Sequence, residues 1–239
     1  MRQWLSNSTD LRRITELEGT RTKSTNVSVL GMMWNAETDM FSFQKKSLVP
    51  IYTAKVTKRS VLSGASSVFD PLGLASPVTI RARLFISELW RDKYDWDIEL
   101  PTEKVDNWRA IATDLEKISD IEFPRGYGLD RKRPVQLHAF CDASLNAIGT
   151  AVFLKQDDCV SLVGSKSKIV GQSAKPAATV PQLELSAMVL CAKHVDNLVK
   201  AFKTDYPQLS VNYWTDSEIG LYWLNSEKQL IEASNCNES

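Results

Sequence analysis

The sequence predicts an α/β protein in which a mixed-sheet C-terminal domain follows a smaller, mainly helical connection region that contains a β-hairpin. Three observations carry this prediction. Apolar residues occupy every second position from Val135 to Cys141, which is typical of a strand. A long apolar stripe at helical spacing follows Pro181, and two shorter helical patterns follow Pro77 and Pro101. The 239 residues are enough for two such parts.

Residues 1–57 combine a short polar opening with a hairpin pattern. The polar run at 35–39 predicts a turn, because apolar residues flank it on both sides. We therefore expect two strands around this turn. Their apolar members are Val27, Val29, Leu30, Trp34, Met40, Phe41 and Phe43.

Residues 58–124 are expected to form a helical connection region. Ser60 is placed to cap a first helix, and the Asp70-Pro71-Leu72-Gly73 run is expected to end it, because proline and glycine interrupt helices. Further helices are predicted after Pro77 and Pro101. The following stretch, 125–134, is rich in glycine and charged residues and predicts a linker.

Residues 135–239 are expected to form the mixed-sheet domain, cut short at its C-terminal end. The predicted order is strand, strand, strand, helix, strand, helix. These elements cover 135–142, 147–154, 160–163, a helix from Pro181 to Ala201, 211–214 and the stretch around Ile219.

Charge is balanced over the chain, with 29 basic and 29 acidic side chains. This balance gives no support to a nucleic-acid partner, since phosphate binding usually requires a basic surplus. Local clusters such as Arg131-Lys132-Arg133 have two interpretations, a phosphate contact or ordinary solvated surface, and the second is the more common.

The cysteines predict neither a zinc site nor a disulfide framework, because the four of them show no CxxC spacing. A reducing compartment fits this pattern. The opening Met1-Arg2-Gln3-Trp4 has no apolar run, and no stretch approaches the ~20 apolar residues that span a membrane. We therefore expect an intracellular, cytoplasmic protein without a membrane partner.

Three acidic residues stand where solubility alone would not place them. Asp142 and Asp216 end predicted apolar strands, and Glu184 lies in the expected first turn of the long helix between Leu183 and Leu185. A carboxylate among buried residues must be paired, hydrogen-bonded or metal-bound. Strand ends and a helix start can bring such groups to one edge of a sheet, where they would hold the divalent ions used in phosphodiester chemistry. Oxygen ligands favour Mg²⁺ or Mn²⁺.

Each residue alone also has a simpler interpretation. Asp142 and Asp216 are good N-caps for an element that follows, and Glu184 would be stabilised by the positive end of its helix. The combination of all three in this order of elements favours the metal site. Ser144 and Ser217 are candidates for hydrogen bonds to the carboxylates.

The histidines and tryptophans have structural interpretations. His138 and His194, on a strand and on the helix stripe, are expected to be structural rather than catalytic. The tryptophans are expected to anchor the core, with base stacking as an alternative for one of them. They are Trp34, Trp90, Trp96, Trp108, Trp214 and Trp223.

These residues resemble the Pao/BEL class of long-terminal-repeat retrotransposon polyproteins, over nearly the whole chain. Val29-Leu30-Gly31-Met32-Met33-Trp34 is similar to a strand near the end of the reverse transcriptase palm. The most diagnostic stretches are Thr57-Lys58-Arg59-Ser60-Val61-Leu62-Ser63 and Phe69-Asp70-Pro71-Leu72-Gly73-Leu74-Ala75-Ser76-Pro77-Val78, continuing to Trp96-Asp97. The stretches that resemble the family's ribonuclease H-like motifs are Phe140-Cys141-Asp142-Ala143-Ser144, Val180-Pro181-Gln182-Leu183-Glu184-Leu185 and Trp214-Thr215-Asp216-Ser217.

The resemblance implies a function as well as a fold. By it, Asp142, Glu184 and Asp216 are the first three catalytic and metal-binding carboxylates of a ribonuclease H site with Mg²⁺ or Mn²⁺. The implied substrate is the RNA strand of an RNA–DNA hybrid, and the implied setting is a cytoplasmic virus-like particle. The rest of a retroelement polyprotein is the other implied partner. The N-terminal 57 residues would be the remnant of a reverse transcriptase.

The chain departs from the family pattern in ways that leave a second function open. Retroelement ribonuclease H domains have a fourth acidic residue on a later segment, and Glu232 or Glu238 is a poor substitute for it. A catalytically inactive remnant that binds nucleic acid is therefore the alternative. No Tyr-x-Asp-Asp motif for polymerisation is present. The family is sometimes labelled an aspartic peptidase, but this sequence does not contain the Asp-Thr/Ser-Gly loop that peptidase chemistry requires.

Overall fold

The computed structural model describes residues 5–17, 19, 24–29, 31–44, 55–171 and 178–226. Its contacts divide the chain into two units. The first comprises Met1–Pro71 and Pro77–Gly128, and the second comprises Leu72–Ser76 and Leu129–Ser239. The predicted regional boundaries at 57, 124 and 134 stay a prediction.

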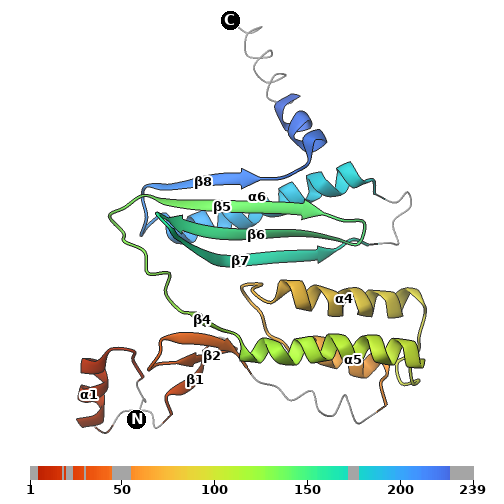
Figure 1. Ribbon diagram of the computed structural model, residues 1–239, viewed down its shortest axis with the longest axis horizontal. Helices are drawn as coiled ribbons and strands as arrows, with labels where there is room; N and C mark the ends of the chain where they lie inside the picture. Colours follow the sequence, from red (N-terminus) through yellow and green to blue (C-terminus); the bar gives the residue numbers. More distant parts are fainter. Residues whose placement is uncertain are drawn as a thin grey trace, which may run out of the picture. The chain divides into compact units, whose positions relative to one another are not determined.

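An antiparallel sheet forms one part of the first unit (Figure 1). In the described part of the chain it has four strands in the order β1 (Asn26–Val29), β2 (Met32–Asn35), β3 (Met40–Phe43) and β4 (Glu122–Pro124). The predicted hairpin is confirmed as β2 and β3. The expected first strand is divided in two at Gly31, whose φ of 83° favours glycine and makes a tight turn. Helix α1 (Thr9–Leu17), in the polar opening, was not predicted.

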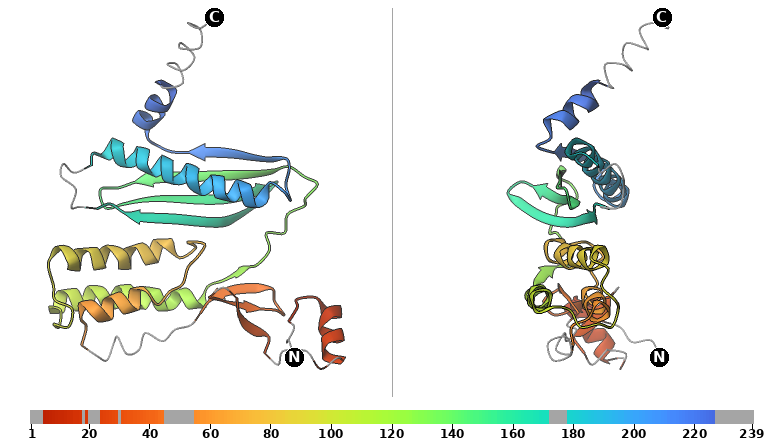
Figure 2. Two further views of the ribbon diagram at one scale, coloured as in Figure 1. Left: turned by 180° about the vertical axis from the view of Figure 1, so that it is seen from behind. Right: turned by 90° about the vertical axis from the view of Figure 1, so that its right-hand side faces the viewer.

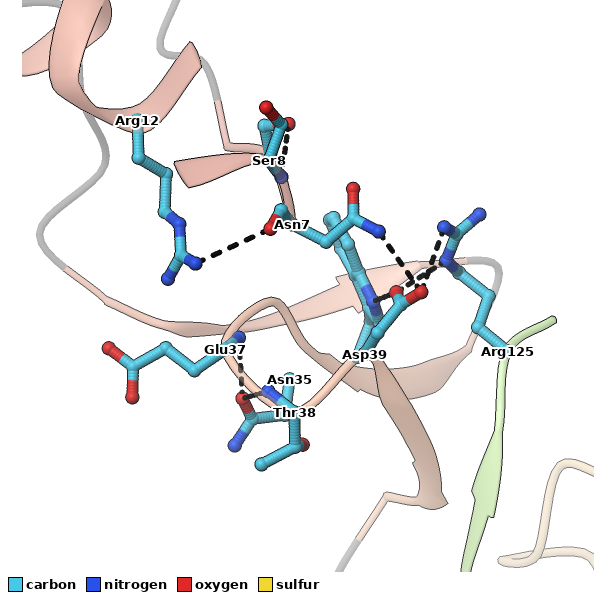
Figure 3. Close-up of polar contacts among 10 residues, drawn as sticks. Asn7, Ser8, Arg12, Asn35, Glu37, Thr38, Asp39 and Arg125 are labelled. Carbon is cyan, nitrogen blue, oxygen red and sulfur yellow. Dashed lines mark hydrogen bonds and ion pairs between the residues drawn. The ribbon is translucent and has the colours of Figure 1, made fainter. Parts of the chain in front are cut away.

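Asp39 ties the turn of this hairpin to β4 and to the N-terminal segment (Figure 3). Its carboxylate accepts two hydrogen bonds from Arg125, at 2.6 and 3.0 Å, and one from Asn7 at 3.1 Å. The indole Nε1 of Trp34 donates a further bond of 2.9 Å. The bidentate bond from Arg125 is the main reason why the pKa of Asp39 lies below its usual 3.8.

Asp39→Asn is expected to destabilise the first unit by about 1–2 kcal/mol at pH 7, because it removes the charge that Arg125 binds. A lowered folded-state pKa stabilises the protein above the unfolded pKa of about 4, and this contribution is lost as the pH falls through the folded value. The difference in free energy of unfolding between variant and wild type, measured in urea, should therefore be smaller at pH 3 than at pH 7. Glu37→Gln, an exposed carboxylate in the same turn, is the control and should change little at either pH.

Helices α3 (Lys58–Ala65), α4 (Ser76–Arg91) and α5 (Thr102–Lys117) confirm the predicted helical pattern. Thr57, not Ser60, is the N-cap of α3. The two residues form a reciprocal capping box, in which Ser60 bonds the Thr57 backbone N–H. The core contains Val61, Leu89 and Trp108, all 0% exposed.

Lys58 is a buried cation in this unit. Its Nζ lies 3.4 Å from the centre of the Trp90 ring and donates a 3.1 Å hydrogen bond to the carbonyl of Tyr94. The Trp96 ring, edge-on to Trp90, lies 5.2 Å from the same nitrogen. The cation–π contacts and the carbonyl offset the cost of burying the ammonium group.

The tryptophan prediction is wrong for most of the set. Trp108 is fully buried and stacks on Phe85, with ring centres 6.0 Å apart. The others that were expected in the core are exposed by 37–53% in the described structure, apart from the half-buried Trp34. The indole rings of the exposed group lie over cations or on open surfaces, where an amphipathic ring is stable without burial. They are Trp90, Trp96, Trp214 and Trp223.

The second unit is a mixed sheet with one helix on it, which confirms the predicted fold class. Figure 2 shows α6 (Val180–Phe202) lying along one face of the sheet. The described strand order is β7-β6-β5-β8, and only the β5–β8 pair is parallel. The strands are β5 (Val135–Ala143), β6 (Ala147–Gln156), β7 (Cys159–Ile169) and β8 (Leu209–Trp214).

The segment Leu72–Ser76 packs against β7, far from it in sequence. The Ser165 amide donates to the Leu72 carbonyl at 2.8 Å, and the Ser165 hydroxyl donates to the Gly73 carbonyl at 2.5 Å. A Cβ at Gly73 would overlap the Ser165 backbone, and the φ of Gly73 is 73°. The Pro-Leu-Gly run therefore covers part of an edge strand. It does not end α3 as expected, because that helix already ends at Ala65.

Gly73→Ala is expected to lower the stability of the second unit by about 1–3 kcal/mol, because it adds a steric overlap to an unfavourable backbone angle. Gly128→Ala is the matched control. Gly128 also has a positive φ, of 64°, but an added Cβ there meets nothing within 4 Å. Thermal melts of the two variants separate the overlap from the backbone effect. Equal losses would contradict the packing of this segment on β7.

Candidate active site

Asp142 and Asp216 lie at the same end of two neighbouring parallel strands. The register pairs Phe140 of β5 with Trp214 of β8, and each aspartate follows its aromatic residue by two positions. Both aspartates are exposed. On β5 the odd-numbered residues are buried toward α6, so Asp142 belongs to the other face of the sheet, at its edge.

Glu184 approaches this end of the sheet from helix α6. The helix begins at Val180, with Thr179 and Gln182 forming a capping box. Glu184 therefore lies just past the first turn of α6, not in it as expected, and that turn contains no acidic residue. The Oε2 atom of Glu184 instead accepts a 2.5 Å hydrogen bond from the Ser217 hydroxyl.

Ser217 connects α6 to the segment that carries Asp216. Its side chain is buried, with 4% of the residue exposed, and its oxygen also accepts a 3.0 Å bond from the Gly220 amide. This second bond caps the helical residues 218–226. A Cβ at Gly220 would overlap the end of Met188, so glycine permits the close approach. Ser144, the other candidate, bonds the Ala147 carbonyl at 3.0 Å and closes a turn.

The simpler interpretations of the three carboxylates do not hold. Ser217, and not Asp216, caps the helix after β8. Asp142 accepts a 2.7 Å bond from the next amide, that of Ala143, within a strand rather than at a helix start. Glu184 lies beyond the turn where a helix dipole acts most strongly. Their placement is therefore not explained by capping.

The donor set suits a hard divalent cation, since it consists of carboxylate oxygens. Among the residues that the structure describes, no three His, Cys, Asp or Glu side chains lie close enough to hold a metal ion together. Glu184 is linked to the neighbour of Asp216, and Asp142 lies on the adjoining strand. Sharing an ion would therefore require the three side chains to lie closer together than they do here.

Ser217→Ala is expected to destabilise the second unit by about 1–2 kcal/mol, because the Gly220 amide loses its cap and Glu184 loses its buried donor. Ser186→Ala is the control, since Ser186 is an exposed serine on α6 whose hydroxyl donates to the Gln182 carbonyl of its own helix. Urea denaturation measures both. If the two variants unfold alike, the buried hydroxyl does not hold these elements together.

The face of the sheet away from α6 carries Trp214, which the sequence interpretation placed in the core. Trp214 stacks on Phe140 and on His138, with ring centres 6.0 and 5.9 Å apart. The indole Nε1 donates a 3.1 Å bond to Nδ1 of His138. His194, by contrast, lies on the buried side of α6, and burial lowers its pKa. That both histidines are structural rather than catalytic stays a prediction.

Comparison with known proteins gives one family match. A model described as "Pao retrotransposon-like RNaseH-like domain" matches residues 57–217. That description names a ribonuclease H-like domain, as the sequence resemblance implied, and not a peptidase. No curated protein matches the chain.

Among solved structures, two of the foamy viral protease-reverse transcriptase are similar to this chain. One, in complex with double-stranded DNA, is 14% identical to this chain. The match covers 86% of this chain and 34% of the viral chain, with a TM-score of 0.48. The other, in complex with an RNA/DNA hybrid, is also 14% identical. That match covers 86% of this chain and 26% of the viral chain, with a TM-score of 0.45. The chain thus spans about a third or less of their length. In the described part of the chain, no helix is both long and apolar enough to cross a bilayer.

Proposed function

The chain belongs to the family of Pao retrotransposon-like RNaseH-like domains, and from this premise we propose that its second unit hydrolyses the RNA strand of RNA–DNA hybrids with divalent metal ions. The observation that supports this most is the placement of Asp142 and Asp216 at one end of a parallel strand pair, with Glu184 joined to the same end through Ser217.

Asp142, Glu184 and Asp216 would hold Mg²⁺ or Mn²⁺. When bound, such ions activate water and stabilise the charge of a phosphodiester transition state. The chain's own contribution is geometric. The paired strands β5 and β8 bring the two aspartates to the same end of the sheet, and the Ser217 hydroxyl orients one oxygen of Glu184, leaving the other available as a ligand.

The setting of this activity is part of the same proposal. Hydrolysis of hybrid RNA belongs to the copying of a retroelement, so we place it in the cytoplasm, within a particle that the parent element assembles. The rest of the retroelement polyprotein would then be its protein partner, and the hybrid its nucleic-acid partner.

The test is hydrolysis of a labelled RNA–DNA hybrid by the full chain. Cleavage of the RNA strand is expected with Mg²⁺, and none is expected with excess chelator or with the same RNA single-stranded. Cleavage that persists with chelator, or that does not require the DNA strand, would overturn the proposal.

A second candidate is a catalytically inactive domain that binds nucleic acid. It is favoured by one observation, that no three potential ligands lie within reach of one ion among the described residues. It predicts hybrid binding without metal-dependent cleavage. Because phosphate contacts release counterions, that binding would weaken steeply with salt, which fluorescence anisotropy at increasing salt would measure.

A further inference from the structure

Two exposed lysines follow each other along β7, the edge strand beside α6 (Figure 2). Lys168 pairs with Ile148 of β6, which in turn pairs with Ala143 of β5. Ile148 and Ala143 pack against α6, so Lys168 lies on the same face of the sheet as the helix. Lys166, two residues earlier, shares this face by strand alternation. Both side chains are exposed, since α6 packs on β5 and β6 and leaves the edge strand beside it.

Lys193 brings a third charge to this side of the unit, from the helix itself. It follows Glu184 by nine residues, or two and a half turns, so the two side chains leave opposite flanks of α6. Glu184 faces Ser217, which follows β8, so Lys193 lies on the flank toward β7. The next residue, His194, confirms that this flank adjoins β7, because a Cβ at Gly164 would lie 3.6 Å from its Nε2 atom.

The charges of these three lysines are not neutralised by neighbouring carboxylates. Among the described residues none of the three forms an ion pair, whereas Arg131 pairs with Asp205 at 3.3 Å and Lys200 with Asp196 at 2.6 Å. Strand β7 itself contains no acidic residue. Because the whole chain has no net charge, this side of the second unit is a local surplus of positive charge.

We propose that Lys166, Lys168 and Lys193, called here the lysine flank, bind the phosphate backbone of a nucleic-acid duplex. A row of ammonium groups suits a polyanion, because each one donates to phosphate oxygens and binding releases condensed counterions. On β7 the two lysines lie in line along the strand, about 7 Å apart. Lys168 stands at the end of the sheet that carries Asp142, two strands and about 10 Å from β5. A duplex held along the flank therefore passes the end of the sheet where the carboxylates lie.

The inference rests on the proposed function for the choice of duplex, an RNA–DNA hybrid, but not on its hydrolysis. It assigns positioning residues that lie away from the carboxylates and that need no metal ion to bind. Since these lysines would hold substrate and transition state alike, their loss should raise KM and leave kcat unchanged.

The test compares two variants of the full chain that lose the same charge at different places. The first replaces the lysine flank by Lys166→Gln, Lys168→Gln and Lys193→Gln. The matched control replaces three other exposed lysines of the second unit, by Lys132→Gln, Lys155→Gln and Lys203→Gln. Thermal melts check that both variants are folded. Arginine at the three flank positions is the conservative variant and should keep the binding.

Fluorescence anisotropy of a labelled hybrid, in excess chelator, measures binding without cleavage. At low salt the flank variant should bind at least about tenfold more weakly than the control variant. The slope of log K against log salt concentration should also become smaller by about 2–3 for the flank variant, because about one counterion is released for each phosphate contact.

Equal affinities of the two variants would overturn the inference, and the lysines would then only protect the edge strand from pairing with another chain. Absence of hybrid binding by the wild type would overturn it as well. So would tighter binding of poly-glutamate than of the hybrid at the same salt, which would indicate an acidic protein partner. Failure of the proposed function gives a different result, in which the wild type binds the hybrid through the flank but does not cleave it with Mg²⁺. Cleavage with an unchanged KM in the flank variant would contradict this inference alone.

Discussion

Asp142→Asn is expected to lower the rate of Mg²⁺-dependent hydrolysis of a hybrid by about a thousandfold, which corresponds to about 4 kcal/mol in activation free energy. The amide keeps the shape of the side chain but removes the negative charge that a divalent cation requires. Because Asp142 is exposed at a strand end, its replacement should leave the melting midpoint almost unchanged. Single-turnover cleavage of a labelled hybrid measures the rate, and a thermal melt checks the fold.

Asp158→Asn is the matched control. This exposed aspartate lies in the turn between β6 and β7, at the end of the sheet opposite to Asp142, and its replacement should leave the rate within about twofold. The double variant Asp142→Asn/Asp216→Asn should be little slower than either single variant, because ligands of one metal site act as a unit. Equal rates for wild type and Asp142→Asn would show that these carboxylates do not perform the reaction.

The strand-end aspartates could be predicted because strand alternation is encoded locally. Val135, Leu137 and Ala139 are all 0% exposed, as their spacing implies, and the residue that ends such a strand reaches the sheet edge. The partner of Glu184 could not be predicted in the same way. It depends on where α6 begins and on how it crosses the sheet, which no local pattern specifies.

The contacts that the sequence interpretation missed join residues that are distant in the chain. Lys58 was recognised only as part of a family signature, and its buried nitrogen binds the Trp90 ring and the Tyr94 carbonyl. The short strand β4 pairs with β3 through residues that looked like the approach to a linker. A tryptophan is compatible with a core, a cation or an open sheet face, and only the fold decides among them.

Trp108 is the tryptophan whose loss should cost the most stability. It is 0% exposed on α5, and its ring stacks on Phe85 of α4, so it joins the two longest helices of the first unit. Trp108→Ala would remove this ring and leave a cavity that the helices can fill only in part. We expect a loss of about 3–5 kcal/mol, measured as the free energy of unfolding in urea.

Trp108→Phe separates the packing of the ring from its polar atom. The indole Nε1 is buried and has no hydrogen-bond partner among the described residues, so replacing it removes an unsatisfied donor as well as part of the ring. These effects oppose each other, and the phenylalanine variant should lose no more than about 1–2 kcal/mol. If it loses as much as the alanine variant, the indole nitrogen has a partner and the first unit is held together by more than apolar packing at this site.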